Sequence, residues 1–244
     1  MEKLATEDLK SIVRQIVDNF LGKIIYDIHK IYGLATETLR HYLGDKWVDQ
    51  NAFAFIQERV LTENRKGRNF LRTGDPIAEN SFRHELRIFQ LAELIFNLQS
   101  IYGIDGRIAA IKEGGLESTY GELECAAQIK KANLSFRFIT PSGIKGRDYD
   151  IEIISALDTY LNCELKVTTE EKDLQKSILV NKLIAARKQL PERQPGIIFL
   201  KIPESWHKRT SAQHLLIENV LWELNNPKGK GWIRFRDIVE QVQN

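Results

Sequence analysis

The sequence predicts a mixed α/β (α+β) protein, in which an all-helical N-terminal region precedes a core of order αβββαβ around a central mixed sheet. In the first part of the chain, apolar residues recur at three- and four-residue steps, as they do in amphipathic helices. After Gly114 and Gly115, short runs rich in Ile, Val, Phe and Tyr alternate with helical patterns. A hydrophobic content of 43% is enough for a buried core. We therefore expect a helical region at 1–112 and a second domain at 113–244.

The helical region begins with a long apolar stripe from Thr6 to Tyr32. Thr6 is suited to cap the start of this helix, and Gly33 is suited to end it. A polar segment with a basic bias, 64–76, is interpreted as a solvated connection. We expect further helices at 36–42, 49–61 and 81–102.

The second domain follows the order αβββαβ, which favours a mixed sheet flanked by helices. Pro141, Gly143 and Gly146 mark the turn between its first two strands. We expect helices at 119–132, 173–190 and 206–224. We expect strands at 134–139, 148–154, 160–167 and 196–202.

Composition excludes several function classes. The chain carries 35 Lys plus Arg against 33 Asp plus Glu, and this net charge of +2 argues against a polybasic protein but not against a local phosphate-binding groove. Cys125 and Cys163 form neither a CxxC pair nor a Cys/His cluster, so we expect no disulfide framework and no zinc site. Because the sequence lacks a signal-peptide pattern and any apolar run near the roughly 20 residues that cross a bilayer, we expect a soluble cytoplasmic protein without a membrane partner.

Acidic residues gather on the expected strand 148–154. Successive side chains of a strand point to opposite faces, so Asp148, Asp150 and Glu152 should share one face. Tyr149 should then point to the other face.

The next expected strand, 160–167, carries an acid and a lysine on one side. The same alternation groups Glu164 with Lys166 and turns Cys163 toward the opposite face, where it would be a core thiol. If the two strands are neighbours, the carboxylates of one strand and the Glu/Lys pair of the other converge.

Such a cluster indicates a particular chemistry. Carboxylates repel one another, and keeping several of them ionised in a partly buried place generally needs a cation. Mg²⁺, with Mn²⁺ as a substitute, is the natural partner of carboxylate oxygens, and it keeps waters for a phosphate substrate. A neighbouring lysine can orient the attacking water and offset the charge that builds on a phosphoryl group. These are the parts of metal-assisted phosphodiester hydrolysis.

The tripeptide Glu164-Leu165-Lys166, together with the acidic strand before it, resembles the motif of the PD-(D/E)XK nucleases, also called restriction-endonuclease-like. The resemblance covers roughly 113–205 and includes the order αβββαβ. It implies a Mg²⁺-dependent endonuclease, a hydrolase that acts on nucleic acid, with DNA favoured. The alternative is a protein of the same fold that has lost activity and binds nucleic acid or protein, and a third possibility is a helical interaction protein.

The resemblance also implies roles for individual residues. Glu164 and one of the two aspartates would bind the metal, and Lys166 would assist the nucleophile. Arg147 stands where the family has proline. The register of the motif favours Asp148 as the metal ligand. Asp150 is expected on the same strand face as Asp148, so both aspartates stay candidates.

Members of this family often contribute a glutamate from the first helix of the core. Helical geometry places Glu122 at the margin of the apolar stripe and Glu124 nearly opposite, which favours Glu122 as a metal ligand. Thr119 to Glu122 equally fits a capping box, in which Glu122 would accept from the backbone of Thr119. Glu117 is a weaker reserve.

The helix after the tripeptide carries Gln175, Lys176 and Lys182, which we expect to contact nucleic acid. A solvated helix face explains these residues equally well. The sequence does not decide whether the chain forms a homodimer, although enzymes that cut both strands of a duplex often do.

Overall fold

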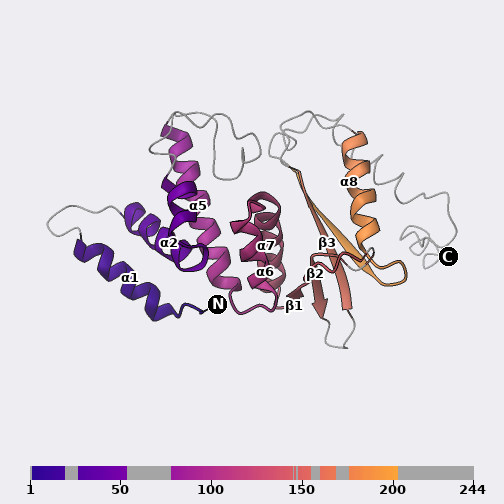
Figure 1. Cartoon of the computed structure of the whole chain (residues 1–244), viewed down its shortest axis with the longest axis horizontal. Coiled ribbons are helices and arrows are strands. Elements are labelled where there is room, and N and C mark those ends of the chain that lie inside the picture. The colour runs from indigo at the N-terminus through magenta and orange to yellow at the C-terminus, as the bar shows by residue number, and fades with distance from the viewer. Residues whose placement is uncertain are drawn as a thin grey trace, which may run out of the picture.

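The computed structural model describes residues 2–19, 27–53, 78–144, 146, 148–154, 160–168 and 176–202 (Figure 1). The helices are α1 (Thr6–Asn19), α2 (Asp27–Leu43), α3 (Asp45–Val48), α5 (Ala78–Leu98), α6 (Ile104–Lys112), α7 (Leu116–Lys131) and α8 (Lys176–Gln189), with a π-helical turn η1 at Asp49–Phe53. The strands are β1 (Ser135–Phe138), β2 (Ile151–Ile154), β3 (Tyr160–Val167) and β4 (Gly196–Lys201). The chain is therefore a mixed α/β protein with a helical N-terminal region, as the sequence predicts.

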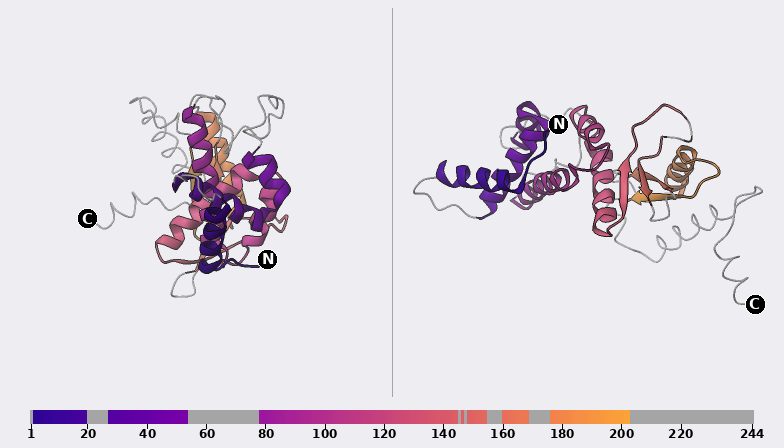
Figure 2. Two further views of the ribbon diagram at one scale, coloured as in Figure 1. Left: turned by 90° about the vertical axis from the view of Figure 1, so that its left-hand side faces the viewer. Right: turned by 90° about the horizontal axis from the view of Figure 1, so that it is seen from below.

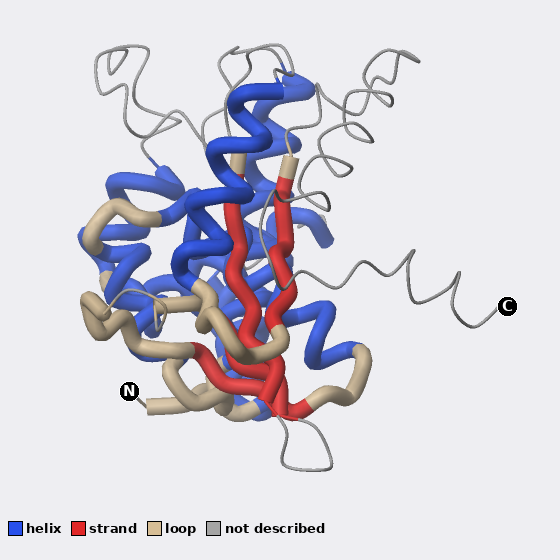
Figure 3. Tube along the Cα trace, turned by 90° about the vertical axis from the view of Figure 1, so that its right-hand side faces the viewer, coloured by secondary structure: helices blue, strands red, loops and turns tan. Residues whose placement is uncertain are grey.

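The four strands form one mixed sheet in the order β1-β2-β3-β4. β1 pairs with β2 and β2 with β3 in antiparallel fashion, whereas β3 and β4 are parallel and are joined through α8. The register places Phe138 opposite Ile151 and Ile151 opposite Cys163, so these apolar side chains share one face. α7 covers this face, and α8 packs on the other (Figures 1 and 3).

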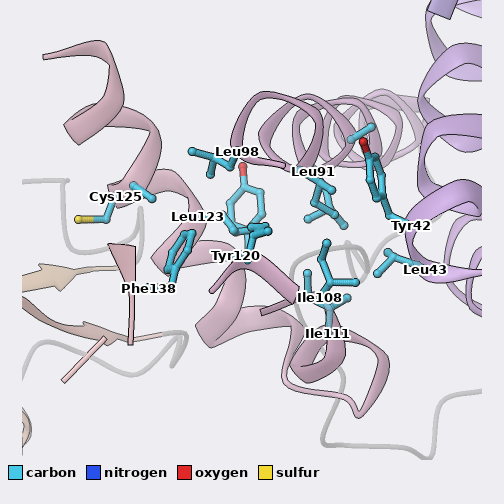
Figure 4. Packing of buried hydrophobic residues seen from close by; sticks show 14 of the residues in the cluster. Tyr42, Leu43, Leu91, Leu98, Ile108, Ile111, Tyr120, Leu123, Cys125 and Phe138 are labelled. Atoms are coloured by element: carbon cyan, nitrogen blue, oxygen red, sulfur yellow. The ribbon is translucent and has the colours of Figure 1, made fainter. Parts of the chain in front are cut away.

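The hydrophobic core continues across the expected boundary between 112 and 113. Figure 2 shows the helical region and the sheet following one another along the long axis of the molecule. In Figure 4, Tyr120 of α7 lies between Leu91 of α5, in the helical region, and Phe138 of the sheet. All of these side chains belong to one buried cluster. The helical region and the sheet thus stabilise each other by burying a common apolar surface.

The N-terminal helical stripe is divided differently from the prediction. α1 ends at Asn19 and α2 begins at Asp27, with 20–26 outside the described residues. Gly33 does not end a helix but lies inside α2, where an added Cβ would be 2.9 Å from Cδ1 of Ile16. This glycine therefore serves the close packing of α1 on α2. Of the other expected helices, 36–42 is part of α2, 49–61 is described as far as residue 53, and 206–224 lies outside the described residues.

Gly103 joins α5 to α6. α5 ends at Leu98 rather than at Tyr102, and Gly103 precedes α6, a helix that the apolar pattern did not separate from its neighbours. The φ of Gly103 is 86°, in the left-handed region, and the adjacent carbonyl of Tyr102 accepts from the Phe138 N–H at 2.9 Å. The turn between the two helices is thereby attached to the end of β1. No helix in the described part of the chain has the length and apolar character needed to span a bilayer.

Gly103→Ala is expected to destabilise the protein more than Gly114→Ala. Both glycines have a left-handed φ, where a side chain costs about 1–2 kcal/mol. At Gly103 the new Cβ would also lie 2.5 Å from the carbonyl oxygen of Phe138, whereas at Gly114 it would meet nothing within 4 Å. Urea unfolding of the two variants measures the difference. Equal losses in the free energy of unfolding would show that the close approach to β1 is unimportant.

Candidate active site

The acidic strand begins later than expected. β2 starts at Ile151, so Asp148 and Asp150 precede it, although the backbone of Asp150 still hydrogen-bonds to Cys163 of β3 and to Ile139. The hydroxyl of Tyr149 donates to Oε2 of Glu152 at 2.8 Å, although the sequence placed these two side chains on opposite faces. The prediction that Asp148, Asp150 and Glu152 share one strand face is therefore wrong for Asp148, and Tyr149 does not point away from Glu152.

Asp148 lies on the exposed loop before β2. Its Oδ1 accepts from the backbone N–H of Ser142 at 2.6 Å and from the Ser142 hydroxyl at 2.7 Å. These hydrogen bonds hold the pKa of Asp148 below its ordinary value. The carboxylate thus closes the loop between β1 and β2 and does not join the cluster of acids described next.

Glu152 has partners of its own. It is buried on β2, where its Oε1 lies 2.6 Å from Nη2 of Arg137 on β1. Together with the Tyr149 hydroxyl, this guanidinium compensates the buried charge of Glu152. The structure therefore does not bring Glu152 to the other site candidates.

Asp150 reaches from the start of β2 to β3. Its Oδ2 accepts from the backbone N–H of Leu165 at 2.7 Å, in the middle of the predicted tripeptide. The side chain of Glu164 is fully buried, and its Oε1 accepts from the ammonium group of Lys166. Its Oε2 is also buried, and within the described part of the chain it has no hydrogen-bond partner. Burying such an atom costs free energy unless it gains a ligand. Oε1 of Glu117 is buried without a hydrogen-bond partner too, but the oxygen of Glu164 lies near Asp150 and Lys166, which makes it the better candidate for a binding position.

Lys166 connects the sheet to α8. Besides Glu164, its ammonium group donates to Oε1 of Gln189, and the amide of Gln189 lies 3.4 Å from the carbonyl oxygen of Asp148. The side chain of Lys166 stays 25% exposed, so its charged end can meet a substrate. Cys163 points away from this pair into the core, and burial raises its pKa to about 12, which confirms that it is a structural thiol.

Glu122 joins the cluster from α7. The capping-box alternative is wrong, because α7 begins at Leu116 and Thr119 already lies inside the helix. Oε2 of Glu122 instead lies 2.7 Å from Nε of Arg107, a buried residue of α6. Glu124 forms an ion pair with Lys201 of β4. It does not join the cluster, in line with the preference of helical geometry for Glu122.

Burial raises the pKa of each carboxyl in this cluster, and repulsion from Asp150 adds to the effect at Glu122 and Glu164. Burial, followed by the negative charge of Asp150, raises the pKa values of Glu122 and Glu164 to about 7. Burial also raises the pKa of Asp150, against the opposing effects of the Leu165 N–H, of Arg107 and Lys166, and of a hydrogen bond that Glu164 donates to Asp150 when Glu164 is protonated. Burial raises the pKa of Glu117, the reserve candidate, to about 7, but that side chain interacts with other charges and not with these three acids.

The three carboxyls and two cations could accept one more cation. Fully ionised, Glu122, Asp150 and Glu164 carry one charge more than Arg107 and Lys166 neutralise. Carboxylate oxygens suit Mg²⁺ or Mn²⁺, and Mg²⁺ needs just one or two of them, so the orphaned oxygen of Glu164 and the nearby Asp150 fit such an ion. Within the described ranges, no three His, Cys, Asp or Glu side chains are arranged as a ready-made metal cage.

Of the three residues expected to contact nucleic acid, two lie in the part of the chain that the structure describes. Gln175 lies outside the described residues, and Lys176 is the first residue of α8, with its backbone alone described. The ammonium group of Lys182 donates to the carbonyl oxygen of Val167 at 2.9 Å, which places it at the end of β3 near the tripeptide. Contact of these residues with nucleic acid stays a prediction.

Sequence reasoning missed Arg107 and Gln189. The sequence did contain a signal for Arg107. A buried carboxylate cluster requires cations, and Arg107 lies within the helical segment just before Glu122. Nothing in the sequence around Gln189 indicated a contact with Lys166. The chain matches no protein-family model, no curated protein and no solved structure. Its function must therefore be argued from this geometry.

Proposed function

We propose that the protein is a metal-dependent nuclease that hydrolyses phosphodiester bonds, with DNA as the favoured substrate. The observation that carries the proposal is the buried, unpaired Oε2 of Glu164, which lies in a cluster with Asp150 and Lys166. An oxygen-ligand site next to a lysine provides the groups that metal-assisted phosphodiester hydrolysis uses. The resemblance of the tripeptide to the PD-(D/E)XK motif supports the same reaction and favours DNA.

Each residue has a distinct role in this proposal. Asp150 and Glu164 hold the divalent cation, which when bound activates a water and offsets the charge of the scissile phosphate. Lys166 orients the attacking water and donates to the phosphoryl oxygens as their negative charge grows. Gln189 fixes the ammonium group of Lys166 from the side of α8. Asp150 is fixed in turn by the N–H of Leu165.

The first test is cleavage itself. Plasmid DNA and single-stranded DNA are incubated with the protein, with and without Mg²⁺ or Mn²⁺. We expect cleavage that requires the metal and disappears with a chelator. Cleavage of neither substrate at any metal concentration would exclude nuclease activity on DNA.

The two aspartates provide a matched pair of variants. Asp150→Asn is expected to reduce the cleavage rate by roughly 10²-fold or more, because it removes a charged metal ligand beside Glu164. Asp148→Asn is expected to cut nearly as fast as the parent, since that carboxylate serves the Ser142 loop. Initial rates on plasmid DNA measure both. A larger loss in Asp148→Asn than in Asp150→Asn would reverse the assignment of the ligand.

A second candidate function is a binding module of the same fold without activity. The observation in its favour is the ion pair between Glu122 and Arg107, which leaves the described residues without a three-ligand cage. This alternative requires that Mn²⁺ does not bind at Asp150 and Glu164. Calorimetric titration with Mn²⁺ separates the two candidates, because the nuclease proposal requires heat that Glu164→Gln abolishes.

A further inference from the structure

Arg107 lies at the centre of the carboxylate cluster but belongs to the helical region. It projects from α6 and is 8% exposed. Its Nε lies 2.7 Å from Oε2 of Glu122, and its Nη2 lies 4.0 Å from Oδ1 of Asp150. The guanidinium carbon is 5.4 Å from the ring centroid of Phe138, on whose face the group rests. A positive charge thus already lies between two of the three acids.

The position of this charge matters for how many metal ions the site can take. A divalent cation shared by Glu122 and Asp150 would need oxygens from both at about 2.0–2.2 Å. The guanidinium is always protonated, and it lies in the space between these carboxylates. Glu164 is different, because its buried Oε2 has neither a hydrogen bond nor an ion pair among the described residues, whereas Oε2 of Glu122 is ion-paired to Arg107.

We propose that the guanidinium of Arg107 takes the place of a second divalent cation, so that the site binds a single ion at Asp150 and Glu164. Glu122 then stays ion-paired to the protein and does not act as a ligand. This inference rests on the proposed function, since it concerns the metal that the nuclease would use.

Arg107 also positions the aspartate ligand. Its Nη2 donates to the carbonyl oxygen of Asp150 at 2.9 Å and to that of Ile139 at 3.2 Å, which ties the segment before β2 to the segment after β1. Only a forked donor can make these bonds and pair with Glu122 at once, so a lysine would keep the charge but lose the bridge. Charge and positioning can therefore be separated by substitution.

The test is the number of Mn²⁺ ions bound per chain, measured by calorimetry and by electron paramagnetic resonance of free Mn²⁺. The wild-type protein should bind one ion. Arg107→Met, which keeps the length of the side chain without its charge, should bind two, because Glu122 and Asp150 become free to share the second ion. Arg107→Lys should still bind one ion, with a lower free energy of unfolding than the wild type because the bridge to the two carbonyls is lost.

The outcomes distinguish this inference from the proposed function. If the wild type binds no Mn²⁺, the nuclease proposal itself fails. If the wild type binds one ion and folded Arg107→Met also binds one, the metal site stands and the role of Arg107 is disproved. Two ions in the wild type would overturn the inference as well, even if Arg107→Met does not fold. The double variant Arg107→Met/Glu122→Gln, which removes the charge of Arg107 together with that of its ion-pair partner, should return to one ion, and two ions there would contradict the assignment of Glu122.

Discussion

Glu164→Gln and Lys166→Met are each expected to reduce metal-dependent DNA cleavage by roughly 10²- to 10³-fold while the protein stays folded. Glutamine keeps the shape of Glu164 but loses the charge that holds a divalent cation. Methionine keeps the length of Lys166 but cannot donate to a phosphoryl oxygen. Initial cleavage rates, measured at a Mg²⁺ concentration that saturates the parent, give the loss of activity in each variant. A titration with Mn²⁺ should show that Glu164→Gln no longer binds the ion and that Lys166→Met still does.

The chain offers a matched control for these variants. Glu124 and Lys201 form a second carboxylate–ammonium pair between α7 and β4, on the face of the sheet that α7 covers. Glu124→Gln and Lys201→Met remove the same chemical groups outside the cluster of Glu122, Asp150 and Glu164, so both should cut like the parent. If these controls lose as much activity as the site variants, the loss reflects stability and not chemistry. If all four variants cut at the parental rate, the site is wrongly assigned.

The sheet domain was predictable because its signals are local. The strand 160–167 has the bounds that the alternation of its side chains indicated, and the same alternation correctly turned Cys163 into the core and Glu164 with Lys166 to the opposite face. Residues 162 to 165 are all buried, because both faces of the strand are covered, yet the apolar Cys163 and Leu165 share one face and the polar Asn162 and Glu164 share the other, as the sequence pattern indicates.

The site depended on features that are not local. Which aspartate is the candidate metal ligand, Asp148 or Asp150, depends on where β2 begins. This strand has four residues and is too short for the alternation of its side chains to indicate its first residue. The role of Glu122 depended on the start of α7, since a helix that begins at Leu116 removes the capping alternative. Arg107 meets Asp150 across 43 positions of sequence, through a side-chain hydrogen bond from α6 to the segment before β2 that no motif encodes.

The raised carboxyl pKa values predict an unusual pH dependence of stability in the metal-free protein. A carboxyl with an ordinary pKa of 4.5 in the unfolded chain and about 7 in the fold, as for Glu122 and Glu164, holds its proton more tightly when folded. The free energy of unfolding should therefore fall as pH rises from about 4.5 to 7 and should level off above that range. One such carboxyl contributes on the order of 3 kcal/mol to the fall. Asp148, whose pKa is lowered, acts in the opposite direction but at a lower pH.

Thermal unfolding in a chelator between pH 5 and pH 8 measures this dependence. Glu164→Gln should flatten the curve without abolishing the slope, because Glu122 and Glu117 still titrate in the same window. Mn²⁺ binds the ionised carboxylates of the folded protein, so it should raise the melting temperature most above pH 7 and little near pH 5. Stability that increases with pH through this range would contradict the buried cluster. A slope that is present but insensitive to Mn²⁺ would instead show that the acids are buried together without serving a metal.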